Sequence, residues 1–107
     1  MRRIALMTDF GTRDPYVAAM KGVLASRTDA PIVDLTHEIA PFDVLEGAWF
    51  LRTVVPYWPE GTIFVCVVDP GVGTERRIVA VEEGGRVFLA PDNGLLSLLS
   101  FVIPSVS

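Results

Sequence analysis

The sequence feature most informative about the fold is the segment Thr62-Ile63-Phe64-Val65-Cys66-Val67-Val68-Asp69. It is apolar at consecutive positions, rich in β-branched and aromatic residues, and it ends at a carboxylate. A strand that is apolar on both faces is typical of the middle of a parallel sheet, where helices cover both sides. We therefore predict a buried strand over residues 62–68, within an α/β fold.

Outward from this strand, segments typical of strands alternate with segments typical of helices. The predicted strands are 4–9, 31–35, 62–68, 78–81 and 87–90. The predicted helices are 15–27, one from 44 to before Pro56 or Pro59, and one from 95. Such alternation predicts parallel pairing with helices on the sheet. Gly84-Gly85 predicts a hairpin between the last two strands, because glycine adopts the positive φ of tight turns. We expect a three-layer αβα sandwich with a mostly parallel, Rossmann-like sheet.

Two of the predicted helices have aspartates at their expected starts. Asp14 precedes Pro15, which suits a first helical position, and Asp43 precedes an apolar helical pattern. Aspartate accepts hydrogen bonds from the first amides of a helix. We therefore predict that both residues are N-caps.

The bulk composition fits one globular domain and excludes several function classes. The chain has 107 residues, half of them hydrophobic, and a net charge of −4 with scattered basic residues. This charge argues against a nucleic-acid surface, which needs clustered Lys and Arg. The single cysteine, Cys66, excludes an internal disulfide. The first apolar stretch is interrupted at Asp9, too early for a signal peptide or membrane span, so we expect a cytoplasmic protein.

Carboxylates recur where the predicted parallel strands end. They are Asp9, Asp34, Asp69 and Asp92. Open parallel sheets bind ligands outside the carboxyl ends of their strands, so this edge predicts a negatively charged site for a cation or for ribose hydroxyls. The alternative is that the aspartates stabilise turns. For Asp34 and Asp92 the two interpretations stay equal, and for Asp9 and Asp69 we favour function.

The strand predicted over residues 62–68 is followed by the segment Asp69-Pro70-Gly71-Val72-Gly73-Thr74-Glu75-Arg76. Its glycines match neither a phosphate loop nor a dinucleotide fingerprint. A carboxylate and a guanidinium on one loop can orient a polar reactant such as water, although a surface ion pair is the alternative. The lone His37 is interpreted as a turn residue. No spacing indicates zinc, and the aspartates match no compact calcium loop, so we expect no metal.

Eight motifs in order carry a family resemblance. They are Met7-Thr8-Asp9-Phe10-Gly11, Asp14-Pro15-Tyr16-Val17, Met20-Lys21-Gly22, Asp34-Leu35-Thr36-His37, Pro41-Phe42-Asp43, Glu46-Gly47-Ala48, Val67-Val68-Asp69-Pro70-Gly71-Val72-Gly73 and Pro91-Asp92-Asn93-Gly94-Leu95-Leu96. The series closely resembles the S-adenosylmethionine hydroxide adenosyltransferases, or adenosine-forming S-adenosylmethionine hydrolases, relatives of the fluorinase and chlorinase. The resemblance runs from about residue 4 to Leu96.

The resemblance implies attack by water or hydroxide on the ribose C5′ of S-adenosylmethionine, with methionine leaving and without metal or cofactor. It places Asp9 on the ribose hydroxyls, Asp14 on the methionine ammonium group, and Phe42 against the nucleoside. Asp69 and Arg76 match two members of an Asp-Arg-His set that activates water. The halogenases have a tyrosine in place of Asp69, so the aspartate favours water over halide.

The end of the chain departs from this family. Residues 95–107 carry no charge, and the resemblance places the third water-activating residue, a C-terminal β domain and a shared site in a homotrimer beyond this sequence. We therefore expect an incomplete N-terminal adenosyl-binding domain over 1–99, an atypical tail over 100–107, and weak or no activity in isolation. The alternatives are a non-catalytic module binding adenosine or S-adenosylmethionine, halogenase-type substitution and, more distantly, a metal-dependent phosphoesterase.

Overall fold

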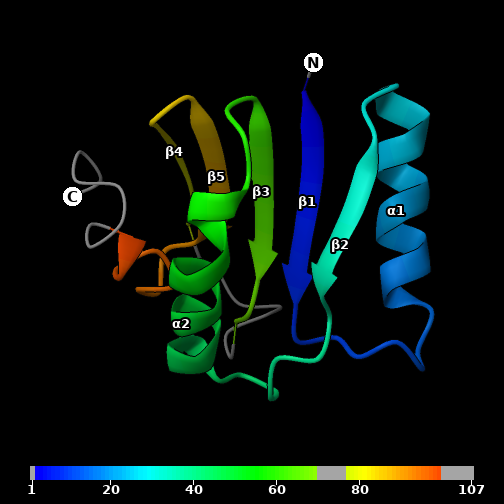
Figure 1. The fold of residues 1–107 in the computed structure, drawn as a ribbon. Helices are drawn as coiled ribbons and strands as arrows, with labels where there is room; N and C mark the ends of the chain where they lie inside the picture. The colour runs from blue at the N-terminus through cyan, green and yellow to red at the C-terminus, as the bar shows by residue number, and fades with distance from the viewer. Residues whose placement is uncertain (1, 70–76, 100–107) are drawn as a thin grey trace.

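The computed structural model describes residues 2–69 and 77–99 and contains the strands that the sequence predicts (Figure 1). In chain order the elements are β1 (Arg3–Thr8), α1 (Tyr16–Arg27), β2 (Ile32–Thr36), α2 (Val44–Val54), the short 3-10 helix η1 (Val55–Tyr57), β3 (Thr62–Val67), β4 (Ile78–Glu83) and β5 (Arg86–Pro91).

The sheet has the order β2-β1-β3-β5-β4. Strands β2, β1, β3 and β5 are parallel, and β4 alone pairs antiparallel, with β5. Helix α2 lies in front of the sheet in Figure 1, on the connection from β2 back past β1 to β3. Helix α1 lies beside β2, the strand at one edge of the sheet. The mostly parallel α/β prediction is confirmed.

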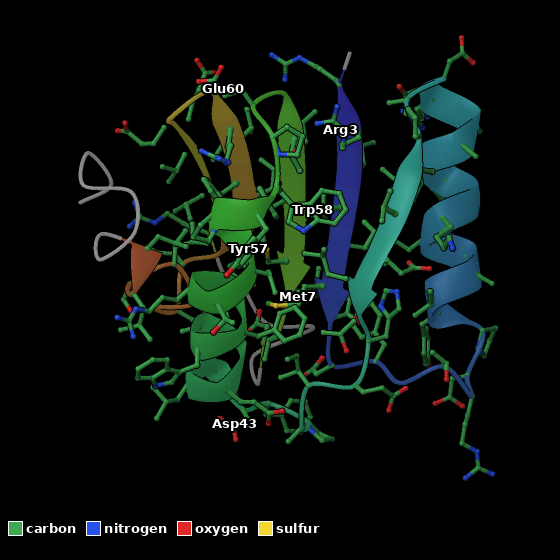
Figure 2. All side chains as sticks on the ribbon, in the orientation of Figure 1. Arg3, Met7, Asp43, Tyr57, Trp58 and Glu60 are labelled. Atoms are coloured by element: carbon green, nitrogen blue, oxygen red, sulfur yellow. The ribbon has the colours of Figure 1, made fainter. Side chains whose placement is uncertain are left out.

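The core lies between the sheet and α2. Its members come from β1, α2, η1, β3, β5 and the segment after β5, and include Met7, Leu51, Val55, Phe64, Cys66, Phe88 and Leu95. Phe64 and Phe88 stack across β3 and β5 with ring centroids 5.0 Å apart. Figure 2 shows Met7 near the end of β1 and Asp43 at the start of α2, so this helix begins at the edge where the parallel strands end.

The predicted helix cap at Asp43 and the predicted hairpin turn agree with the structure, whereas the predicted cap at Asp14 does not. Asp43 accepts a hydrogen bond from the Glu46 amide, and Gly84 and Gly85 have φ of 61° and 75°, so the predicted cap and hairpin are confirmed. Asp14 is not an N-cap: Pro15 occupies that position without a side-chain cap, because the helix begins one residue later than predicted.

The helix predicted from Leu95 is also corrected over the described residues. Residues 95–98 form turns, in which the Ser97 amide donates to the Gly94 carbonyl, and the chain beyond Leu99 lies outside the described residues. In the part of the chain that the structure describes, no helix combines the length and the apolar character needed to cross a bilayer.

Cys66 is fully buried in β3, and desolvation raises the pKa of its thiol to about 12. The thiolate is the reactive form, so the folded protein should be inert towards iodoacetamide at mildly alkaline pH. Unfolding in urea should restore the ordinary thiol reactivity, which mass spectrometry of the alkylated chain would measure. Equal alkylation rates with and without urea would contradict the buried position.

Candidate functional site

The four strand-end aspartates share one edge of the sheet. The strand order places them in the sequence Asp34, Asp9, Asp69, Asp92 along that edge, because β2, β1, β3 and β5 are parallel. Asp34 lies within β2, opposite Leu6, and the others follow their strands by one or two residues. The inner two, Asp9 and Asp69, therefore follow neighbouring strands.

The two outer aspartates are paired with cationic side chains. Lys21 donates to Asp34 Oδ2 at 2.9 Å, and Arg77 donates to Asp92 Oδ2 at 2.8 Å. His37 Nε2 lies 2.8 Å from Asp34 Oδ1. The hydrogen bonds from His37 and then Lys21 lower the pKa of Asp34. Both outer aspartates therefore take part in ion pairs, and the choice between a structural and a functional role stays a prediction.

The inner aspartates flank the point where the direction of the chain along the sheet reverses. After β1 the next strand is β2, on one side of β1, and after β3 the next strand is β4, which lies beyond β5 on the opposite side. Residues Thr8 and Val67 are register partners, and the Asp9 amide donates to the Val67 carbonyl at 3.2 Å. Asp69 is 5% exposed. Open α/β sheets bind ligands in the crevice at such a reversal, so Asp9 and Asp69 occupy the favoured position.

The loop between β2 and α2 brings an aromatic residue to Asp9. The Phe42 amide donates to Asp9 Oδ2 at 2.7 Å, although 33 residues separate the two. Phe42 has a positive φ of 64°, and its side chain is 60% exposed. The exposed ring of Phe42 can pack against the ring of a ligand, while the neighbouring Asp9 carboxylate accepts hydrogen bonds from the ligand's hydroxyl groups.

The remaining predicted residues are placed as follows. Asp14 is exposed on the loop that connects β1 to α1, the loop that also carries Asp9. Tyr16 contacts the ring of Phe10 on that loop, with centroids 6.2 Å apart. Arg76, the predicted partner of Asp69, lies outside the described residues. The structure thus brings Asp9, Phe42 and Asp69 to neighbouring segments.

Two residues near the ends of β1 and β3 were given no functional role from the sequence. Asn93 donates to the Val68 carbonyl at 2.9 Å and accepts from the Leu95 amide, so it ties the segment after β5 to the end of β3. His37 lies in a bend, as predicted, but it is 5% exposed and bridges Thr8 and Asp34. The only sequence signal for this bridge is the three-residue spacing from Asp34.

The described residues offer two further places where a ligand could bind, a metal cluster or a surface hollow. Among residues 2–69 and 77–99, no three His, Cys, Asp or Glu side chains are grouped so that they could hold a metal ion. A hollow of about 300 Å³ lies beside β4, and we call it the β4 hollow; Asp92 lines it, whereas Asp9 and Asp69 do not. Its lining includes Val79, Val81 and Leu96.

The ion pair of Asp34 gives a pH prediction. Its folded pKa lies below the ordinary value of 3.8, so the stabilisation is present above that value and is lost as pH falls through the folded pKa. Asp34→Asn should lower the free energy of unfolding at neutral pH by about 1 kcal/mol or less, since the side chain is 41% exposed. Urea titrations should show this difference shrinking in acid; a difference that grows on acidification would contradict the assignment.

Comparison with known proteins identifies the family. Residues 4–104 match the SAM hydroxide adenosyltransferase N-terminal domain. A relative from Thermus thermophilus, named (R)-S-adenosyl-L-methionine hydrolase, is 47% identical over 105 residues, which are 97% of this chain and 41% of that protein. A protein of the same name from Methanocaldococcus jannaschii is 43% identical, over 91% of this chain and 39% of its own length. A fluorinase from Actinopolyspora mzabensis is 35% identical, over 88% of this chain and 40% of its own.

Solved structures agree with the sequence relatives. The crystal structure of a conserved hypothetical protein from Thermus thermophilus superposes with a TM-score of 0.88 at 45% identity, over 97% of this chain and 44% of the other. This chain therefore spans about two fifths of the length of the curated relatives it matches. On the strength of the match over residues 4–104, the chain belongs to the SAM hydroxide adenosyltransferase family and corresponds to its N-terminal domain.

Proposed function

We propose that the sheet edge at the ends of β1 and β3 binds S-adenosyl-L-methionine and that the reaction is its hydrolysis to adenosine and methionine. The observation that carries this proposal is the position of Asp9 and Asp69 at the chain reversal, with Phe42 hydrogen-bonded to Asp9. The relatives named (R)-S-adenosyl-L-methionine hydrolase support the substrate, including the R configuration at sulfur.

In the proposed complex the ribose hydroxyls donate to Asp9, and the nucleoside packs against Phe42. The Asp9 carboxylate is a charged acceptor, which makes stronger hydrogen bonds to hydroxyls than a neutral group does. Asp14, exposed on the same loop, would pair with the methionine ammonium group. A negatively charged edge also suits a substrate with a sulfonium and an ammonium charge.

In the proposed reaction a water oxygen bonds to C5′ while the C5′–S bond breaks. The bonding electron pair stays on sulfur and gives the thioether of methionine, and the attacking water loses one proton. The sulfonium is already a good leaving group, so the protein mainly has to orient the water and exclude competing solvent. Asp69, 5% exposed at the end of β3, is proposed to accept the proton that the water loses, with Arg76 as its companion. This scheme requires no metal or cofactor.

The setting of the full site is also part of the proposal. The resemblance supports a cytoplasmic homotrimer in which a neighbouring subunit completes the site. The halogenase alternative is less well supported, because the fluorinase relatives are 35% identical whereas the hydrolases are 43–48% identical. The resemblance also places a tyrosine in the halogenases where this chain has Asp69.

Product analysis tests the reaction directly. The chain is incubated with the R and S forms of S-adenosyl-L-methionine in water enriched in ¹⁸O, and adenosine is analysed by mass spectrometry. We expect slow release of adenosine that carries ¹⁸O at the 5′ oxygen and forms from the R form, because a neighbouring subunit completes the proposed site. Binding without adenosine release would favour the non-catalytic module, and a 5′-halogenated product that depends on added halide would overturn the choice of water.

A further inference from the structure

His37 joins two elements through both nitrogens of a buried ring. Nδ1 lies 2.8 Å from Thr8 Oγ1 at the end of β1, and Nε2 lies 2.8 Å from Asp34 Oδ1 in β2. An ionised carboxylate only accepts hydrogen bonds, so Nε2 carries a hydrogen and donates the hydrogen bond to Asp34. In the neutral ring Nδ1 is then an acceptor, and the Thr8 hydroxyl donates to it.

The same histidine holds the turn that contains Asp9. Thr8 Oγ1 accepts a hydrogen bond from the Phe10 amide at 3.2 Å, and the His37 carbonyl accepts one from the Gly11 amide at 2.7 Å. Thr8 is fully buried, so its hydroxyl depends on these protein partners rather than on bulk water. The turn over residues 8–11 is therefore fixed at both ends by His37, on either side of Asp9.

We propose that His37 is a positioning residue: through the Thr8 hydroxyl it holds the Asp9 carboxylate in the orientation that binds the ribose. It does not touch the substrate in this account. The identity of the ligand rests on the proposed function, whereas the effect on Asp9 does not. The Phe42 amide, which donates to Asp9 Oδ2 at 2.7 Å, reports the position of that carboxylate without any ligand.

Two substitutions separate the two contacts of the ring. In His37→Asn the shorter amide reaches the position of Nδ1 and can still accept from Thr8, but the contact to Asp34 is lost. In His37→Gln the longer amide reaches the position of Nε2 and can still donate to Asp34, but the contact to Thr8 is lost. His37→Gln removes a buried hydrogen bond and His37→Asn removes a part-buried one. A purely structural role therefore predicts that, within each variant, exchange of the Phe42 amide changes in proportion to that of a core amide.

Hydrogen exchange and adenosine binding measure the outcome. We expect His37→Gln to speed exchange of the Phe42 amide about tenfold relative to that of the Phe64 amide in β3, and to raise the Kd for adenosine about tenfold. His37→Asn should stay within about twofold of the unsubstituted chain in both measurements. Equal Phe42 exchange in the two variants would overturn the positioning role. If the unsubstituted chain fails to bind adenosine while the exchange rates still differ, the proposed function fails and the positioning of Asp9 stands.

Discussion

Replacing Asp69 by Asn is expected to lower the rate of adenosine release by about 100-fold or more, with the affinity for S-adenosyl-L-methionine unchanged within about twofold. The amide keeps the shape of the carboxylate, but it is a much poorer proton acceptor for the attacking water. Asp69 is 5% exposed, so bulk solvent does not readily take over this role. Single-turnover rates and equilibrium binding would separate the chemical step from substrate affinity.

Asp92→Asn is the matched control for this prediction. Asp92 lies at the same edge of the sheet, but it pairs with Arg77 and follows β5, which does not neighbour β1. Its replacement should leave the rate within about twofold, because it lies outside the reversal where the ligand is proposed to bind. Equal losses in the two variants would show that the edge acts through its overall charge, and Asp69 would lose its assigned role.

Replacing Asp9 by Ala is expected to weaken adenosine binding by about 100-fold. The physical reason is the loss of charge-assisted hydrogen bonds to two ribose hydroxyls, each worth about 1.5–3 kcal/mol. Calorimetric titration of the purified chain with adenosine would measure the change. 2′-Deoxyadenosine should bind the unsubstituted chain more weakly than adenosine, and Asp9→Ala should largely remove this preference.

Asp9→Asn separates the ligand contact from the local fold. The amide oxygen of asparagine can still accept the Phe42 amide, so the loop between β2 and α2 should keep its position. Binding should nevertheless fall about tenfold or more, because the charge that strengthens the hydroxyl contacts is gone. Unchanged affinity in both Asp9 variants would remove Asp9 from the site.

Much of the fold could be predicted from the sequence because local patterns and tertiary structure agree. The uninterrupted apolar run of β3 predicts a central strand, and β3 lies third of five in the sheet. Gly84-Gly85 predicts the hairpin that joins β4 and β5, and both glycines adopt positive φ. Helix α1 begins at Tyr16, one residue later than predicted, because Asp14 and Pro15 both suit the first positions of a helix.

The site was predictable only where strand ends determine it. Parallel strands bring their carboxyl ends to one edge, so the row of aspartates follows from the strand pattern alone. The hydrogen bond between Phe42 and Asp9 depends on the left-handed backbone of Phe42, a non-glycine residue, and no periodicity signals it. The burial of His37 likewise depends on how β1 and β2 pair, because its partners Thr8 and Asp34 lie on those two strands.

The most direct test of the account is an NMR titration of the ¹⁵N-labelled chain with adenosine. If the nucleoside lies between the ends of β1 and β3, the largest amide shifts should fall on Asp9–Gly11, Phe42 and Asp69, with Val79 and Val81 little changed. Shifts centred on the β4 hollow, or no shifts at millimolar adenosine, would contradict the proposal that the inner aspartates hold the adenosyl group.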